Sequence, residues 1–440
     1  MLRHLLVCAV VLTLCHASAC LAGENRDEMV RSDKKKMDGD ESWIYNDFAK
    51  GLEEAKKAGK PLMVVMRCIP CHACKLVDED VAARDKVSKD LMDKFVCVRL
   101  VQANNLDLTF FQFDYDMSWA VLFMNADKTI YARFGSRFEQ RQGNPDEVKA
   151  SLQGLRKCME SVLAVHQGYP GNKGDFANKQ PKPVTVTRPE DFPKLKDYKP
   201  NINYETNTAK SCLHCHQIRD AEREANRASM PEPMLFPYPN PETIGLNLDP
   251  AQTSKVASVA AGSPAEKAGV KAGDELAKLD GQPVCSIADV VWALHHFKSG
   301  ALAGEVKRGA ESKAVTFNLD PNWRALSDMS WRVSTWALRG KALGGMILED
   351  LSADERQKLN LAANALGVRI KGVGAYGEHA LAKNSGFMKN DVIVEFDGLA
   401  TYMTESQIIA HIIQKHKLGD AINVSVMRAG QKKQLTYKVQ

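Results

Sequence analysis

The sequence has little net charge of either sign. Lys and Arg together number 59 and Asp and Glu 54, which leaves a formal net charge of +5. This balance is too weak to indicate a nucleic-acid partner or a polybasic surface that binds membranes. Beyond residue 22 the chain also lacks an apolar run near the roughly 20 residues of a membrane-spanning helix. We therefore expect no nucleic acid among its partners and no transmembrane segment.

The first 22 residues have the pattern of a secretory signal peptide. They carry one charged side chain, and their apolar run at 5–14 is too short to span a bilayer. Cleavage after Ala19 or after Ala22 would satisfy the small-residue rule at the cleavage site. Cleavage before Cys20 would instead allow a lipid anchor on that cysteine. Either way, we expect a periplasmic or otherwise extracytoplasmic location, which is oxidising.

The eleven cysteines are unevenly placed along the chain. Three fall in the signal peptide, three in the segment CIPCHAC at 68–74 and two in the segment CLHCH at 212–216. Tight clusters of this kind indicate redox or cofactor chemistry rather than a framework of scaffold disulfides. Cys97, Cys158 and Cys285 stand alone and are expected to be buried as small apolar side chains.

Patterns along the chain predict several parts. Residues 41–166 alternate helical and strand patterns, which favours an α/β layer fold. Twelve of the 18 prolines fall between Pro170 and Pro250, which indicates an extended linker with one helical island at 215–229. The predicted organisation is a signal peptide at 1–22, an α/β domain at 41–166, a Pro-rich linker with the CLHCH motif at 167–243, related units at 244–320 and 343–440, and a Trp-rich bridge at 321–342.

The CIPCHAC segment directly follows a predicted buried strand at 62–66. A strand that leads into C-x-x-C at the start of a helix is a redox arrangement. The unpaired N–H groups and partial positive charge of the helix N-terminus stabilise a thiolate there. From these residues alone, a reactive dithiol, a structural disulfide and a metal or Fe–S site all remain open.

With the Lys-Pro pair at 60–61 before the strand, the same segment resembles the thioredoxin superfamily. The resemblance implies a thioredoxin-like fold in which Cys71 is the exposed nucleophile and Cys74 the resolving thiol. It places His72 between the two thiols and leaves Cys68 as an additional cysteine of the catalytic segment. The Trp usual before the dithiol, the buried Asp of the preceding strand and the proline opposite the dithiol are absent.

The CLHCH segment fits C-x-x-C-H, the attachment pattern for c-type haem. In this interpretation Cys212 and Cys215 form thioethers with a covalent haem c, and His216 is the metal ligand that binds its iron. Met230 lies downstream at a separation that would allow it to be the sixth ligand. The alternatives are a disulfide that caps the following helix and a partial zinc site.

The two related units carry a weak internal repeat, since residues 256–284 recur loosely at 370–398. The stretch at 263–284, with its SPA, AG, GD and DG elements, resembles the PDZ domains of HtrA-type periplasmic proteases. The resemblance implies two PDZ-like, partly open β-barrels that bind peptide or protein C-termini by strand addition and carboxylate capture. It places these residues in the two carboxylate-binding loops: Ile244, Gly245, Leu246, Leu343, Gly344, Gly345 and Met346.

Protease chemistry is not expected despite this resemblance. The sequence contains no Gly-Asn-Ser-Gly-Gly nucleophile segment and no suitably spaced His, Asp and Ser to accompany one.

The order of the parts resembles the thioredoxin/PDZ domain-containing (seleno)protein family of planctomycete-type bacteria. HCHQ at 214–217, GLNLD at 245–249 and SWR at 330–332 carry this resemblance best. It implies a multidomain α/β and α+β protein in the extracytoplasmic space.

Our functional hypothesis is a thiol-disulfide oxidoreductase that holds clients through its PDZ units and exchanges electrons with a redox partner protein. A non-catalytic peptide-binding scaffold with structural cysteines is the main alternative. Electron transfer by a haem alone is the third hypothesis.

Overall fold

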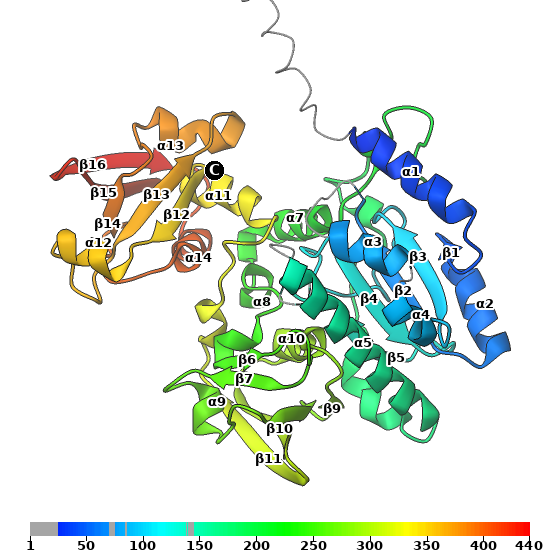
Figure 1. Cartoon of the computed structure of the whole chain (residues 1–440). Coiled ribbons are helices and arrows are strands. Elements are labelled where there is room, and N and C mark those ends of the chain that lie inside the picture. Colours follow the sequence, from blue (N-terminus) through cyan, green and yellow to red (C-terminus); the bar gives the residue numbers. More distant parts are fainter. Residues whose placement is uncertain (1–24, 70–74, 84–85, 138, 140–144) are drawn as a thin grey trace, which may run out of the picture.

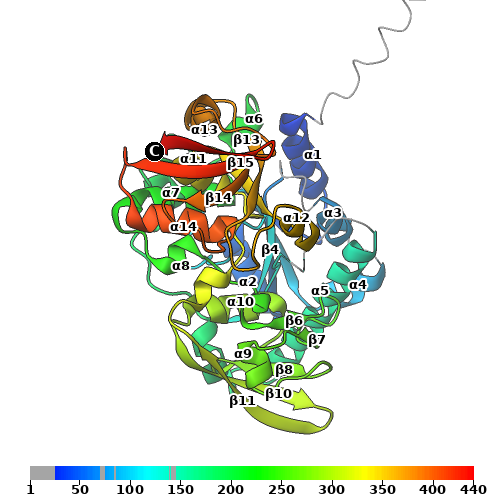
Figure 2. The same cartoon turned by 90° about the vertical axis from the view of Figure 1, so that its left-hand side faces the viewer.

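The computed structural model describes residues 25–69, 75–83, 86–137, 139 and 145–440. Figure 1 shows three folded units, which we call the amino-terminal unit (25–167), the middle unit (244–320) and the carboxy-terminal unit (343–440). We call residues 168–243 the belt and residues 321–342 the bridge, because they connect these units. Figure 2 shows the units after a quarter turn, with the carboxy-terminal strands β15 and β16 toward the viewer.

The amino-terminal unit is built on a five-stranded sheet in the order β1-β3-β2-β4-β5. The strands are β1 (Ile44–Tyr45), β2 (Leu62–Arg67), β3 (Val96–Val101), β4 (Trp119–Met124) and β5 (Ile130–Phe134). The helices are α1 (Arg26–Asp38), α2 (Phe48–Ala58), α3 (Lys75–Ala83), α4 (Lys86–Met92) and α5 (Pro145–Gln167). β1, β2 and β3 are parallel, whereas β4 and β5 form an antiparallel hairpin. The predicted alternation of helices and strands and the buried strand at 62–66 are confirmed by these elements, whereas α1 lies before the predicted start of the domain.

The central strand β2 is apolar on both faces, and this explains how the belt folds. Side chains alternate along a strand, so Met63 packs into the core beneath α3, α4 and α5 and Val64 into the core on the opposite face. The belt residues Leu213 and Ile218 join that second core. The belt is therefore not the extended linker that its composition predicts, because one face of the sheet needs it as cover.

The belt is made of short helices. They are η2 (Lys173–Lys179), η3 (Pro189–Asp191), α6 (Thr208–Ser211), α7 (Cys215–Ala225), η4 (Arg227–Ser229), α8 (Glu232–Leu235) and η5 (Pro241–Ile244). The predicted helical island at 215–229 corresponds to α7 and η4.

The middle and carboxy-terminal units share one order of elements. The middle unit has β6 (Leu246–Leu248), β7 (Val256–Val259), α9 (Pro264–Lys267), β8 (Glu275–Leu279), β9 (Gln282–Pro283), α10 (Ile287–His296), β10 (Gly300–Arg308) and β11 (Glu311–Leu319). After η6 (Trp323–Leu326) and α11 (Thr335–Leu343), the carboxy-terminal unit has β12 (Met346–Asp350), α12 (Ala353–Lys358), β13 (Val368–Val373), η7 (Gly377–Ala380), α13 (Leu381–Asn384), β14 (Val392–Phe396), α14 (Glu405–Lys415), β15 (Ala421–Arg428) and β16 (Gln431–Lys438).

The repeat extends to individual side chains. Asp274 forms a bidentate ion pair with Arg308, with both N–O distances at 2.7 Å. Asp391 forms the matching bidentate pair with Arg428, with both distances at 2.6 Å. Asn390 stands where the first copy has a glycine before the Asp, and it adopts the same left-handed backbone with φ 73°. Asn tolerates that conformation better than most residues, so the sequence difference leaves the turn intact.

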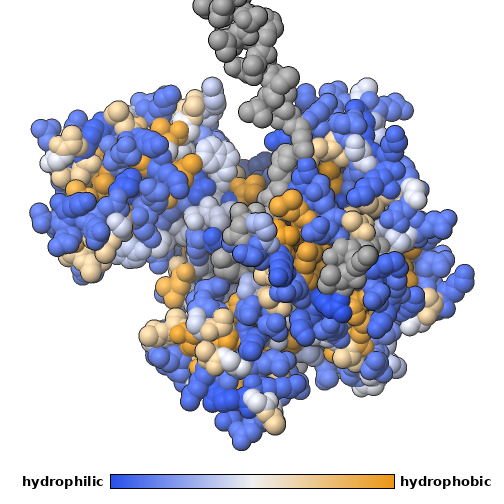
Figure 3. All heavy atoms as spheres, in the orientation of Figure 1, coloured by the Kyte–Doolittle hydropathy of each residue, from blue (hydrophilic) through white to orange (hydrophobic). Residues whose placement is uncertain are grey.

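The described strands form open sheets and do not close into barrels, which corrects the predicted partly open β-barrels. The middle unit has a four-stranded sheet in the order β11-β10-β8-β9 beside a separate β6-β7 pair, and the carboxy-terminal unit has β12-β13-β14-β15-β16. Short strands such as β6 and β9 pair over too few residues to continue the ladder around the core. Figure 3, in the orientation of Figure 1, shows that this face of the molecule is mostly hydrophilic, with apolar patches near its middle.

Buried charges join the middle unit to the amino-terminal sheet. Lys179 of the belt and Asp289 of α10 form an ion pair at 2.6 Å, and neither side chain is exposed. Asp289 also accepts the backbone N–H of Arg133 in β5 at 3.0 Å, and the Arg133 guanidinium lies 3.4 Å from the ring centre of Trp292. Because these polar groups are satisfied only when both units are docked, they fix α10 against β5.

We predict that Lys179→Met lowers the free energy of unfolding by about 3 kcal/mol, because it leaves the Asp289 carboxylate buried without its cation. The control is Lys173→Met, which removes an exposed ion pair with Asp127 and should lower the stability far less, because water screens exposed ion pairs. Urea denaturation of both variants measures the difference. Equal stability of the two variants would show that the buried pair does not hold the units together.

Candidate functional site

The two cysteine motifs meet at the carboxyl end of β2. Cys71, Cys74 and His72 lie outside the described residues, in the connection between β2 and α3. Cys68 is described; it is 3% exposed, and its Sγ lies 2.8 Å from Nδ1 of His214. The CIPCHAC segment therefore contacts the CLHCH segment, although 146 residues separate the two contacting residues in the sequence.

Backbone contacts fix the CLHCH segment in this position. The N–H of Ala103, in the loop after β3, donates to the Leu213 carbonyl at 2.8 Å. Asn104 accepts the Leu213 N–H at 2.8 Å and donates to the Ser211 carbonyl at 2.9 Å. The Asn104 side chain thus satisfies backbone groups of this segment, as a neighbouring strand would do in a sheet. It was not singled out in the sequence, where nothing distinguishes it from other loop asparagines.

His214 is the N-cap residue of α7, and its surroundings keep its ring neutral. Burial lowers the pKa of His214 to about 4, and the nearby His216 and Arg26 contribute to this lowering. Burial also lowers the pKa of His216. At neutral pH the His214 ring that contacts Cys68 is therefore an uncharged imidazole and not an imidazolium.

The two thiols of the CLHCH segment are buried against protein. Cys212 is 1% exposed and packs with Val30, Ile69 and Val101, and Cys215 is 4% exposed within the second core of the amino-terminal unit. Burial and then Asp27 raise the pKa of Cys212 to about 12, so this group is a neutral thiol.

A haem bonded to both sulfurs would have to displace this packing, so the donor set as folded does not fit a macrocycle. Covalent haem therefore stays a prediction. Met230, the predicted sixth ligand, packs in the core of the carboxy-terminal unit with Leu235 and Phe236.

A pocket of about 410 Å³ lies beside this cysteine region, between α1, α3 and the ends of β2 and β3. Its lining includes Ile69 and Lys75, the residues on either side of segment 70–74. Its deep wall holds charges, since Asp78 pairs with Arg67 at 3.0 Å and with Arg99 at 2.7 Å. Burial opposes ionisation of Asp78, but Arg99 and then Arg67 outweigh it and lower the pKa of this carboxyl.

The loop before β4 faces Cys68 and anchors the bridge. The Cys68 N–H donates to the Ser118 carbonyl at 2.9 Å. Four residues earlier, Asp114 accepts Arg332 of the bridge at 2.7 Å, and Asp116 lies 3.2 Å from the same guanidinium. Asp116 also accepts the Ser334 N–H at 2.8 Å. The SWR element, which in the sequence serves only as a mark of the family, therefore has a structural role at this loop.

The predicted carboxylate-binding loops are tightly packed. Gly245, between Ile244 and Leu246, has φ 83°, and a Cβ there would lie 2.1 Å from Cβ of Ser263. In the second loop, between Leu343 and Met346, Gly344 and Gly345 have φ 59° and 89°. A Cβ on Gly345 would lie 2.0 Å from the His379 carbonyl oxygen. Both loops need glycine for conformation and for space.

The carboxy-terminal unit has a groove beside its edge strand β12. A pocket of about 390 Å³ is lined by β12, by the N-terminal end of α14 and by bridge residues 326–328 and 330. The Leu348 N–H, in β12, donates to Glu405 of α14 at 2.7 Å. Arg339 holds the same carboxylate at 2.5 Å. One edge amide of the groove is thus occupied by a side chain of the same chain.

His295 and His296, at the end of α10, pack against aromatic side chains. The His295 ring stacks on Tyr238 with ring centres 4.0 Å apart, and His296 lies at the same distance from Trp292. Burial lowers the pKa of both histidines, to about 4 for His296. They are neutral packing groups at the junction of the belt and the middle unit.

We predict that Asn104→Ala detaches the CLHCH segment, because it removes both side-chain hydrogen bonds to the segment backbone. Cys212 and Cys215 should then react with a thiol reagent about tenfold or more faster, which corresponds to about 1.4 kcal/mol or more of lost docking energy. The exposed Asn201→Ala is the control and should react at the parental rate. Unchanged reactivity in both variants would show that Asn104 does not hold the segment.

We also predict that acid destabilises the protein through His214. The unfolded residue takes up its proton near pH 6.5, whereas the folded one does so near pH 4. Stability from the neutral ring is fully present above pH 6.5 and falls as the pH drops, by about 2 kcal/mol between pH 7 and pH 5. Urea unfolding of His214→Gln should show a loss of stability between pH 7 and pH 5 that is about 2 kcal/mol smaller than in the parent. An equal loss in the two proteins would show that His214 is not the group responsible.

Comparison with known proteins assigns two of the domains. Residues 43–126 match the family of thioredoxin-like domains, and residues 243–319 match the family of PDZ domains. The chain therefore contains a thioredoxin-like domain in its amino-terminal unit and a PDZ domain in its middle unit.

Similar curated proteins match less than half of the chain. A probable periplasmic serine endoprotease DegP-like of Pseudomonas savastanoi pv. phaseolicola (strain 1448A / Race 6) is 27% identical over 199 residues, covering 45% of this chain and 39% of the relative. A protein with the same description in Pseudomonas putida (strain GB-1) is 29% identical over 207 residues, covering 45% of this chain and 39% of the relative. The chain thus spans about two fifths of the length of these relatives.

Among solved structures, HtrA-type protease AlgW with decapeptide shares 19% identity and covers 36% of this chain and 46% of that chain, with a TM-score of 0.21.

No helix among the described residues is long and apolar enough to cross a membrane.

Proposed function

We propose that this protein is an extracytoplasmic thiol-disulfide oxidoreductase that holds its clients through PDZ-type peptide binding. The contact between Cys68 and His214 carries the proposal, because it joins two cysteine motifs at one end of the sheet in a thioredoxin-like domain. The signal-peptide pattern and the relatives named as periplasmic support the location. An oxidising compartment is where disulfide chemistry on client proteins is needed.

In the reducing direction, the Cys71 thiolate attacks one sulfur of a client disulfide. A bond forms between Cys71 and the client, the client S–S bond breaks, and one client thiolate leaves. The Cys74 thiolate then attacks Sγ of Cys71, and the second client thiolate leaves as the Cys71–Cys74 disulfide forms. Two electrons pass to the client, and a partner dithiol returns two electrons to the protein. The reverse sequence oxidises a client dithiol.

The described surroundings favour a thiolate in this segment. Helix α3 begins at Lys75, directly after Cys74, and its N-terminal N–H groups and partial positive charge stabilise an anion nearby. The pocket of about 410 Å³ next to Ile69 and Lys75 gives a client side chain room to approach. Cys68 supplies a third thiol, held by His214, which can capture a mixed disulfide.

Peptide binding is assigned to the PDZ domain and, by the shared element order, to the carboxy-terminal unit as a second PDZ domain. In the first, the loop Ile244-Gly245-Leu246 would capture a client carboxylate, and in the second the loop 343–346 would do so. A client strand that adds to β12 would compete with Glu405 for the Leu348 N–H. Protease activity is not proposed, because the sequence offers no nucleophile segment for it.

Two other functions remain as hypotheses. Burial of Cys68, Cys212 and Cys215 favours a peptide-binding scaffold with structural cysteines. The C-x-x-C-H order is the attachment pattern of covalent haem, with His216 as the iron ligand, but the packing of Cys212 and Cys215 as folded does not fit a macrocycle. A pyridine haemochrome spectrum of the denatured protein, produced with cytochrome c maturation factors, tests the haem: a retained covalent band supports it, and its absence rules it out.

We predict that Cys71→Ser removes at least nine tenths of the disulfide reductase activity of the full mature chain in an insulin reduction assay. Cys74→Ser should trap the Cys71–client mixed disulfide, visible on non-reducing gels. Cys97→Ser is the matched control, because Cys97 is buried in the core of the same domain and should leave the rate unchanged in the folded variant. An unchanged rate in Cys71→Ser would eliminate the oxidoreductase and leave the scaffold.

A further inference from the structure

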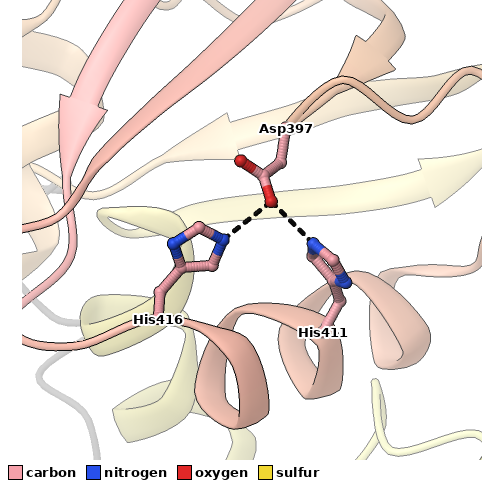
Figure 4. Close-up of side chains that lie close together, drawn as sticks. All are labelled: Asp397, His411 and His416. Carbon is pink, nitrogen blue, oxygen red and sulfur yellow. Dashed lines mark hydrogen bonds and ion pairs between the residues drawn. The ribbon is translucent and has the colours of Figure 1, made fainter.

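Two histidines and a carboxylate converge in the carboxy-terminal unit, far along the chain from both cysteine motifs. Nε2 of His411 and Nε2 of His416 each lie 2.7 Å from the same oxygen, Oδ2 of Asp397. The three ligand atoms lie within 4.8 Å of one another. Figure 4 shows both rings pointing at the carboxylate from one end of α14. We propose that Asp397, His411 and His416 form a binding site for Zn²⁺.

Local structure holds each of the three groups in place. Asp397 has φ 53° in the tight Asp-Gly turn after β14, and its N–H donates to the Asn423 carbonyl at 2.9 Å. His411 lies in α14, and His416 is the C-cap residue of that helix. The ring positions are thus set by one helix end and the carboxylate by the facing turn. The partial negative charge of a helix C-terminus favours a cation there.

A second carboxylate lies behind the ring of His416. Its Nδ1 lies 3.6 Å from Oδ2 of Asp420, and that carboxylate also accepts the Lys417 N–H at 2.8 Å. A carboxylate on this side of the ring can hold the imidazole proton on Nδ1 when a metal takes the place of the proton on Nε2.

The donor types select among cations. Imidazole nitrogens with one carboxylate suit Zn²⁺ and its neighbours in the transition series, whereas Mg²⁺ and Ca²⁺ require shells of oxygen. Zn²⁺ binds nitrogen and oxygen at about 2.0–2.2 Å in a tetrahedron, which sets ligand separations near 3.3 Å. The two N–O distances of 2.7 Å would widen by about half an ångström, within rotamer motion of side chains that are 19–23% exposed. The fourth position would be open to water.

The first copy of the repeat is an internal comparison. Aligning the helix N-caps Ser286 and Thr404 puts Ala293 at the place of His411 and Lys298 at the place of His416. The fold of the unit therefore does not require the two histidines. They are a feature of the carboxy-terminal unit, where a bound ion would clamp the end of α14 to the turn after β14.

We expect the purified full mature chain, stripped with a chelator and dialysed against micromolar Zn²⁺, to bind one more equivalent than His411→Gln/His416→Gln. The cysteine motifs can also bind zinc, so the difference between variants is the measurement. His379→Gln, in the same unit, is the control and should bind as the parent does. Equal stoichiometry in all three proteins would overturn the proposal.

Two further readouts distinguish zinc at this site from zinc at the cysteine motifs. Asp397→Asn, which keeps both histidines and the side-chain volume, should weaken zinc binding at least tenfold, so the test holds even if the double variant does not fold. Co²⁺ at this site should give d–d absorption without a sulfur-to-metal charge-transfer band. Asp397→Asn should lose this d–d absorption. Zn²⁺ should raise the melting temperature of the parent and of His379→Gln by more than it raises that of Asp397→Asn. An equal rise with Ca²⁺ would indicate a carboxylate site and overturn the assignment.

Discussion

The burial of Arg332 between two carboxylates is the constraint on which the arrangement of the units depends. Its guanidinium binds Asp114 at 2.7 Å in the loop before β4, and it donates to the belt carbonyls of Pro237 and Tyr238 at 2.6 and 2.9 Å. One side chain of the bridge therefore satisfies groups from the amino-terminal unit and from the belt. A buried cation without its partners is costly, so docking of the bridge is coupled to docking of the belt on the amino-terminal unit.

The same network reaches the helix of the CLHCH motif. Arg223 of α7 donates to the Ser334 hydroxyl at 2.9 Å, and Ser334 donates to Asp116 at 3.0 Å. α7 is thereby held from the bridge side, while Asn104 holds the start of its motif from the sheet side. The contact between Cys68 and His214 is the product of both restraints, and the site owes its geometry to charges that are remote from the cysteines.

Several elements were predictable because local physics decides them. The strand at 62–66 is buried on both faces and reads as an apolar run, and the repeat of 256–284 at 370–398 reappears as a shared order of elements. The packing of the belt was not predictable, because prolines mark the absence of long helices and not the absence of packing. The burial of His295 and His296 was not predictable either, because a polar pair at a helix end gives no local sign of the Tyr238 ring that covers it.

By itself the sequence determined the buried strand at 62–66, the helical island at 215–229, the repeat, the clustering of cysteines and the glycines that the tight loops require, because each follows from spacing and backbone conformation within a short segment. Only the tertiary structure decided that Cys68 meets His214, that the belt covers one face of the sheet, and that Asp397 lies between two histidines. These contacts join residues that are distant in the chain, up to 146 positions apart in the case of Cys68. Their existence depends on how buried faces and charges are satisfied across units, which no local pattern records.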